Sequence, residues 1–169
     1  MKVVLLGFLL LVCASAPGQT DDEAAVIYAV NSLFTALSEA RGADAAVLYS
    51  STAMDQVRLS FESIRRGIER EDESVLLRLS SAGYSAQPSE ILGWTLSEYL
   101  AATLELPIMS GRYTPLVMRV DSVDVQGRRA LVFITFENRA GAAFPQQAVL
   151  VQEDGRWLVE AFLGMGSFP

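Results

Sequence analysis

The sequence contains no histidine, a single cysteine and a single lysine, and these absences exclude whole classes of chemistry. Histidine is the commonest general base and the commonest transition-metal ligand in proteins, so both roles lose their usual residue. Cys13 and Lys2 both lie in the first 18 residues, so the rest of the chain offers no thiol to zinc and forms no disulfide framework. We therefore expect no metal centre and no cofactor.

Positive charge is also scarce. The chain has 13 Lys and Arg residues against 20 Asp and Glu residues, a formal net charge of −7, and removal of a leader containing Lys2 would make it −8. Nucleic acids and anionic membrane surfaces both require a basic protein surface. The composition therefore predicts no nucleic-acid partner and no binding to an anionic membrane.

The N-terminus carries the pattern of a secretory signal peptide. Lys2 precedes an apolar run from Val3 to Val12, and small residues follow it. This run is too short to span a bilayer, which takes about 20 residues, so we expect no transmembrane helix. We predict a signal peptide over residues 1–18, cleaved before Gln19, and export to the periplasm or the medium.

Cys13 has two alternative fates. It is either removed with the leader or retained as a lipid-modified N-terminal residue. Val12 is bulky where a lipoprotein signal requires a small residue, which favours removal. Lipid anchoring through Cys13 stays open as the alternative.

The sequence pattern predicts helices in the middle of the chain. Residues 19–53 form an N-terminal helical segment in which acidic residues stand at the helix start, where they favour helix formation. Thr95-Leu96-Ser97-Glu98 matches a capping box and predicts a helix that runs to Glu105. A second amphipathic helix carries its apolar stripe on Met54, Val57, Phe61, Ile64 and Ile68.

The sequence pattern predicts a β-sheet in the last third of the chain. Gly127 and Asp154-Gly155 are tight-hairpin signals between alternating apolar segments. The segment from Ala130 to Phe136 is apolar on both faces, which is typical of a central strand. Inward-facing residues of the final strand are expected to be Trp157, Val159, Ala161 and Leu163. The fold class is therefore α+β, with N-terminal helices packed on a curved C-terminal antiparallel β-meander.

Several segments together resemble the nuclear-transport-factor-2-like superfamily, the cystatin-like α+β cone, and in particular its small exported bacterial members. The segments are a helix with an acidic end (61–72), the stretch 75–79 with the Tyr84 loop, and the hairpin stretches 127–132 and 152–159. The resemblance covers Met54 to Phe162. It implies a cone-like domain over residues 54–169, with a pocket on the concave side of its sheet.

The resemblance implies a fold and a pocket without fixing an activity. The superfamily includes ketosteroid isomerases, polyketide cyclases, dehydratases and many non-catalytic binding proteins. Its cyclases and dehydratases typically use His–Asp pairs, which a chain without histidine cannot supply. Isomerase-like members use an Asp base with a Tyr donor, and no motif transfers these roles to particular residues.

Four aromatic residues are the candidate ligand-pocket residues: Tyr84, Trp94, Tyr99 and Tyr113. Tyr84 and Tyr113 are expected in loops, and the other two lie near the capping box. They would line the mouth of the cone and offer polar groups to a small ligand. The alternative is that they close the core with their polar ends in water.

Acidic residues are the other candidates. Asp44, Asp72, Asp121 and Asp124 would serve as general bases if apolar surroundings raised their pKa, but each also fits a solvated turn or strand position. The cluster Glu71-Asp72-Glu73 lacks the alternating oxygen ligands and the glycine of a calcium loop. We name no catalytic residue.

These observations predict a non-catalytic binding or accessory protein whose partner is a small apolar ligand or an envelope protein. One alternative is a pocket enzyme of isomerase or lyase type that uses Asp and Tyr. The other is an interaction module, including a homodimer through the sheet face, where Leu131 and Phe133 lie on the second face of the central strand.

Overall fold

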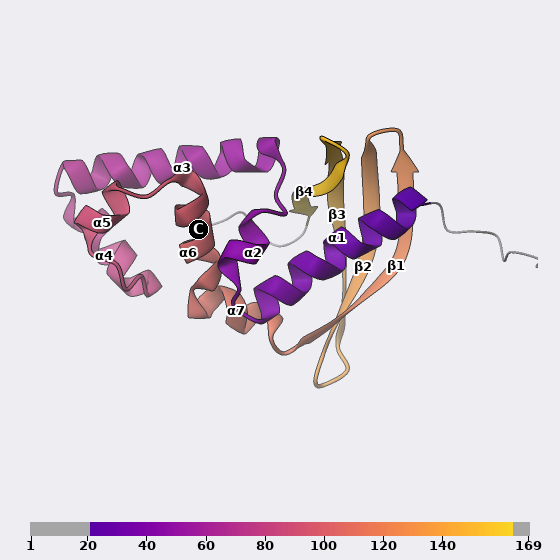
Figure 1. Ribbon diagram of the computed structural model, residues 1–169. Helices are drawn as coiled ribbons and strands as arrows, with labels where there is room; N and C mark the ends of the chain where they lie inside the picture. The colour runs from indigo at the N-terminus through magenta and orange to yellow at the C-terminus, as the bar shows by residue number, and fades with distance from the viewer. Residues whose placement is uncertain (1–20, 164–169) are drawn as a thin grey trace, which may run out of the picture.

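The structure, a computed structural model, describes residues 21–163, so the predicted signal peptide and Cys13 lie outside the described residues. Helices precede a four-stranded antiparallel sheet, which confirms the predicted α+β class (Figure 1). In chain order the elements are α1 (Asp21–Ser38), α2 (Gly42–Ala46), α3 (Ser51–Glu69), α4 (Glu73–Ala82), α5 (Pro88–Leu92), α6 (Leu96–Glu105), α7 (Pro107–Tyr113), β1 (Leu116–Gln126), β2 (Arg129–Asn138), β3 (Ala143–Glu153) and β4 (Arg156–Leu163).

The sheet is a simple meander with the strand order β1-β2-β3-β4, and every pairing is antiparallel. Gly127 has a φ of 62° and Gly155 a φ of 76°, so glycine stands where the two predicted tight turns need the left-handed conformation. Along β2 the side chains of Val132, Ile134 and Phe136 are buried. This alternation gives the sheet one face in the core and one outer face.

The final strand departs from the predicted alternation. Trp157 and Val159 are buried as expected. A register shift between Val149 and Leu150 places Ala161 opposite Val149, on the outer face of the sheet. Because a bulge adds one residue to one strand, it reverses the facing of the residues that follow it. The inward prediction for Ala161 is wrong for that reason, and the side chain of Leu163 lies outside the description.

Helix α1 covers the inner face of the sheet and runs across it (Figure 1). Its apolar stripe is fully buried at Val26, Val30 and Leu33. Near its end, the Phe34 and Phe136 rings lie with centroids 5.6 Å apart. At its start, the Trp157 Nε1–H donates to Asp22 Oδ1 over 3.2 Å. The helix is thus fixed to the sheet at both ends.

A short extended segment joins the helices to the sheet. The Ser50 N–H donates to the Val159 carbonyl oxygen over 2.9 Å, and the Val159 N–H donates to the Leu48 carbonyl oxygen over 2.8 Å. Ser50 is completely buried, and its Oγ accepts from the Ala53 N–H, which caps α3. Glu153 also accepts from both Ser51 N and Ser51 Oγ. Helix α3 therefore begins at a fixed position on the sheet.

Helices α3, α4, α5 and α6 gather at the end of the molecule away from the sheet (Figure 1). Local signals define their ends: Asp72 caps α4, and Gly83 ends it with a φ of 94°. The predicted capping box is confirmed, because Thr95 Oγ1 accepts from the Glu98 N–H and Glu98 accepts from the Thr95 N–H. Within residues 21–163 no helix combines the length and the apolar character needed to cross a membrane.

Candidate functional site

Three of the four predicted pocket residues come together among the distal helices. The Tyr84 and Tyr99 rings are almost parallel, with centroids 6.5 Å apart, and Tyr84 also lies 6.3 Å from Trp94. Phe61 of α3 also stacks on Tyr99, with ring centroids 4.5 Å apart. We call Phe61, Tyr84, Trp94 and Tyr99 the aromatic cluster. It joins α3, α6 and the segments on either side of α5.

Tyr113 lies apart from this cluster. It is the last residue of α7, not part of a loop as predicted, because Pro107 occupies a first-turn position at which proline favours a new helix. Its ring packs edge-on against Phe34 with centroids 6.4 Å apart, on the side of α1. Burial raises the pKa of the Tyr113 hydroxyl.

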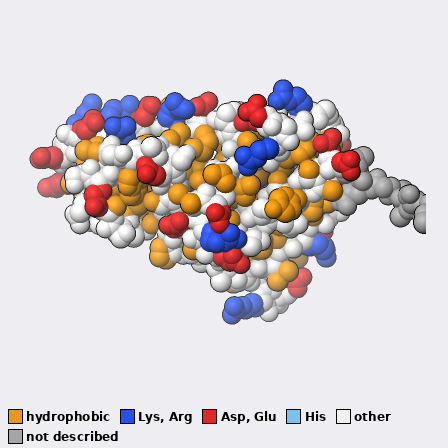
Figure 2. Space-filling view, viewed as in Figure 1, with side chains coloured by type: hydrophobic (Ala, Val, Ile, Leu, Met, Phe, Trp, Pro, Cys, Tyr) orange, Lys and Arg blue, Asp and Glu red, His pale blue; other side chains and the backbone are white. Residues whose placement is uncertain are grey.

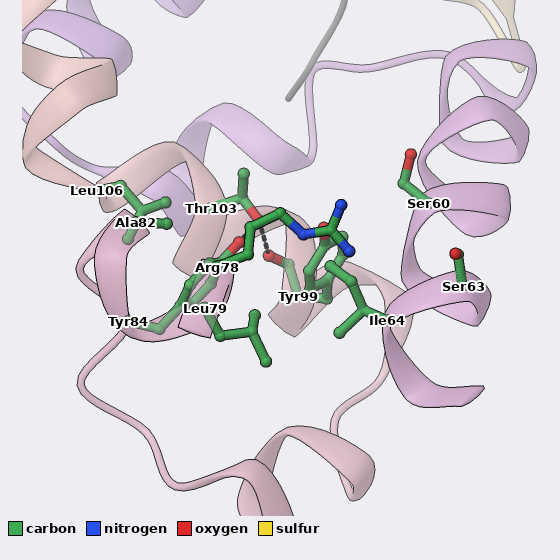
Figure 3. A pocket seen from close by; sticks show the side chains of 10 residues that line it. All are labelled: Ser60, Ser63, Ile64, Arg78, Leu79, Ala82, Tyr84, Tyr99, Thr103 and Leu106. Atoms are coloured by element: carbon green, nitrogen blue, oxygen red, sulfur yellow. Dashed lines mark hydrogen bonds between the residues drawn. The ribbon is translucent and has the colours of Figure 1, made fainter. Parts of the chain in front are cut away.

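A cavity of about 200 Å³ lies beside the aromatic cluster, between α3, α4 and α6 (Figure 3). Leu79, Tyr99, Thr103 and Leu106 are at least nine-tenths buried and form its floor, whereas Arg78 is exposed at the rim. The full lining is Ser60, Ser63, Ile64, Arg78, Leu79, Ala82, Tyr84, Tyr99, Thr103 and Leu106. We call this space the α3–α4–α6 cavity.

A second cavity of about 260 Å³ lies against the same tyrosine. Tyr84 and Leu106 line both spaces, so they form the wall between them. Glu105 brings a carboxylate to the second cavity only. The lining of the second cavity is Gly83, Tyr84, Ser85, Ala86, Trp94, Ala102, Glu105, Leu106 and Pro107.

A directed chain of hydrogen bonds holds Tyr84 in place (Figure 3). Thr103 Oγ1 donates its proton to the Tyr99 carbonyl oxygen over 2.7 Å, because a carbonyl only accepts. Tyr84 must therefore be the donor in its 2.6 Å hydrogen bond with Thr103 Oγ1. The Tyr84 oxygen offers the cavity only lone pairs. Burial raises the pKa of this hydroxyl, so it stays protonated at neutral pH.

The polar groups at the rim of the cavity make no such hydrogen bonds within residues 21–163. Arg78 is the one charged residue in the lining, and it makes no ion pair or hydrogen bond with any residue in the described range. The hydroxyls of Ser60 and Ser63 likewise have no hydrogen-bond partner among residues 21–163. Figure 3 shows Arg78 extending from α4 across the cavity toward α3, which carries both serines.

The four candidate aspartates are all exposed, and none lines the α3–α4–α6 cavity. Asp44 pairs with Arg41, and Asp124 accepts from Gln126 Nε2. Hydrogen bonds from Ser74 lower the pKa of Asp72, and those from Thr135 and then Arg119 lower the pKa of Asp121. A lowered pKa makes these two carboxylates weaker bases at neutral pH.

The part of the chain that the structure describes holds no group of three or more His, Cys, Asp or Glu residues that could bind a metal ion. The acidic run at Glu71 is a helix connection in which Asp72 accepts from the N–H and hydroxyl of Ser74. Its carboxylates therefore serve the start of α4.

The outer face of the sheet is apolar along its middle. Phe133 is 38 % exposed there, on the face opposite to α1, and Leu131 is half-buried. Cross-strand register places Val149 beside Leu131 and Leu158 beside Val151 on the same face. We call these five side chains the outer apolar strip.

Comparison with known proteins adds no relative. No protein family, no curated protein and no solved structure matches this chain. The resemblance to the nuclear-transport-factor-2-like superfamily stays a prediction. The α3–α4–α6 cavity lies among helices, whereas that resemblance implies a pocket on the concave side of the sheet.

The sequence did not single out several residues of this cavity. Arg78, Ser60 and Ser63 were assigned no role in the sequence, yet all three line the cavity. Phe61 is buried, as its place on the apolar stripe predicted, and it also stacks on Tyr99. One usable signal existed: Tyr99 and Thr103 stand four residues apart, which places them on the same face of α6.

Proposed function

We propose that this protein binds a small, largely apolar molecule in the α3–α4–α6 cavity, as an exported binding or accessory protein. The observation that carries the proposal is the convergence of Tyr84, Trp94 and Tyr99 beside a partly enclosed space with a hydrogen-bonded floor. Concave, mostly apolar sites with a few fixed polar groups are typical of small-molecule binding. The leader pattern supports export.

The same cavity gives less support to an isomerase or lyase. Such an enzyme would need a carboxylate base beside a hydroxyl donor. No Asp or Glu lines this cavity, and the proton of Tyr84 is already donated to Thr103. Binding without a chemical step is therefore the function that the geometry favours.

The size of the cavity limits the ligand. Its volume is about 200 Å³. Drug-sized ligands occupy pockets of about 300–1,000 Å³. We therefore expect a ligand smaller than a drug-sized molecule.

A fragment screen by ligand-observed NMR tests the proposal. Ala82 lines the cavity from α4, so Ala82→Phe should fill the space with a side chain and abolish the binding of most hits. Ser81 is an exposed neighbour on the same helix that lines neither cavity, so Ser81→Phe is the matched control. Hits that bind equally well to the wild type and to Ala82→Phe would overturn the assignment of this cavity.

The outer apolar strip supports a second candidate, a homodimer through the sheet face. Its neighbouring charges are paired within the sheet, Arg119 with Asp121 and Arg129 with Glu160. This pairing reduces the repulsion that two copies of an acidic protein would meet at this face.

Sedimentation velocity tests the dimer with a matched pair of variants. Phe133→Ser should shift a dimer toward monomer, and Leu77→Ser, at a 68 % exposed site on α4, should not. A wild-type protein that stays monomeric at high micromolar concentration would remove this candidate.

A further inference from the structure

We propose that the ligand of the α3–α4–α6 cavity is a small carboxylate whose charged group binds at the rim, between Arg78 and the serines of α3, with its apolar body on the floor. This inference rests on the proposed binding function and specifies the ligand class of the same site. Four features of the cavity carry it.

The first feature is the cation in the lining. Arg78 is the one charge in the lining, and it has no ion-pair partner among the described residues. The acid whose pKa it helps to lower, Asp72, already accepts hydrogen bonds from Ser74. The guanidinium presents its donors in a planar fork that matches the two oxygens of a carboxylate.

The second feature is a set of unused donors near that cation. The hydroxyls of Ser60 and Ser63 line the cavity from α3, and neither has a hydrogen-bond partner in residues 21–163. Arg78 extends toward them from α4 (Figure 3). An anion between the two helices would find donors on both sides.

The third feature is the polarity of the remaining lining residues. The Tyr84 hydroxyl donates its proton to Thr103, and the Thr103 hydroxyl donates its proton to the Tyr99 carbonyl oxygen, so a carboxylate placed against either oxygen would meet lone pairs. Leu79, Leu106 and the ring of Tyr99 add apolar surface. The donors that are free to bind an anion are therefore those of Arg78 and the two serines.

The fourth feature is the charge of the lining. No Asp or Glu lines this cavity, and Glu105 lines only the second one. The exposed charges of α3 balance, with Arg58, Arg65 and Arg66 against Asp55, Glu62 and Glu69, and Figure 2 shows cationic and acidic side chains interspersed along this edge of the molecule. The net charge of the lining is therefore that of Arg78, which attracts an anionic ligand and repels a cationic one.

Three probes with the same phenyl group separate the charge from the apolar body: phenylacetate, 2-phenylethanol and 2-phenylethylammonium. We expect phenylacetate to bind at least about tenfold more tightly than the alcohol, because hydrogen bonds to charged groups are the stronger ones. The ammonium probe should bind most weakly. Titration calorimetry on the purified protein measures all three affinities.

The second part of the experiment replaces Arg78. Arg78→Gln should lower the affinity for phenylacetate to that for the alcohol and leave the affinity for the alcohol unchanged. Arg66→Gln removes one exposed arginine of α3 that lines neither cavity, so it controls for the change in net charge. Both variants alter exposed helical positions and should fold normally.

The outcomes distinguish this inference from the proposed function. If the alcohol binds as tightly as phenylacetate, or if Arg78→Gln and Arg66→Gln weaken phenylacetate equally, the carboxylate inference is overturned and the cavity assignment survives. If phenylacetate does not bind at millimolar concentration, the inference is also overturned. Phenylacetate binding that persists unchanged in Ala82→Phe would instead overturn the cavity assignment, and the inference with it.

Discussion

Gly42 lies directly against Ala101, so close that a Cβ atom on Gly42 would overlap the carbonyl oxygen of Ala101. The Gly42 N–H also donates to Glu105 Oε1 over 3.2 Å. This contact presses α2 against α6, the helix that carries Tyr99 and Thr103. The close packing of α2 on α6, and with it the position of Tyr99 and Thr103, therefore depends on glycine at position 42.

Gly42→Ala should consequently destabilise the protein by about 3 kcal/mol, the upper end for overpacking, because the obstacle is backbone and cannot rotate away. Urea unfolding followed by circular dichroism measures the loss. Gly111→Ala is the matched control, since a Cβ there has no neighbour within 4 Å and alanine favours the helix by about 0.5–1 kcal/mol. Equal stability of the two variants would refute the close contact.

Tyr84→Phe should cost about 1 kcal/mol, because it removes the hydrogen bond to Thr103 while keeping the ring. The change should also alter the alkaline pH dependence. Burial raises the folded-state pKa of Tyr84, so its contribution to stability is complete below the unfolded pKa of about 10 and decreases as pH rises above it. The variant should lose stability less steeply in that range. Tyr28→Phe, at a 75 % exposed site, is the control and should leave the free energy of unfolding at neutral pH unchanged.

Glu98→Gln should reduce stability at neutral pH and have little effect in acid. Hydrogen bonds from the N–H and then the hydroxyl of Thr95 lower the folded-state pKa of Glu98. Its contribution is therefore present above the unfolded pKa of about 4.3 and is lost as pH falls through the lower folded value. Urea unfolding at pH 7 and at pH 3 measures the two differences. A constant difference at both values would show that the charge plays no part in the cap.

Asp22→Ala should destabilise the start of α1 more than Asp21→Ala does. Both acids lie in the first turn and interact favourably with the helix dipole, but only Asp22 accepts from the Trp157 indole. We expect a difference of about 1 kcal/mol, measured by circular dichroism in urea. The difference should vanish in a Trp157→Phe background. If it persists there, the indole hydrogen bond is not its cause.

The features that the sequence predicted correctly depend on neighbouring residues. A capping box at Thr95 and Glu98 and a turn at Asp154-Gly155 need only a few adjacent positions, so the sequence contains the whole signal. The facing of Ala161 was mispredicted because the bulge depends on how β4 meets β3, which no pattern in β4 alone reveals.

The sequence predicted which kinds of residue lie near the cavity, but not where in the fold the cavity is. Tyr84, Trp94 and Tyr99 drew attention as aromatic residues with polar ends, and the structure brings them together. Tyr113 has the same chemistry but lies on α7 beside Phe34. The cavity is the space left where α3, α4 and α6 meet, so its position depends on helix packing. Arg78 lines the cavity because of that packing, and no pattern in its own helix predicted this.

The connection between β4 and the first half of the chain also bears on the order in which the chain acquires its structure. Asp22, Leu48 and Ser50 are synthesised early, and their partners Trp157 and Val159 are among the last residues of the described chain. Ribosomal synthesis proceeds from the N-terminus, and contacts between distant residues form slowly. Helix α1 and the start of α3 therefore cannot complete their native contacts until β4 has been synthesised.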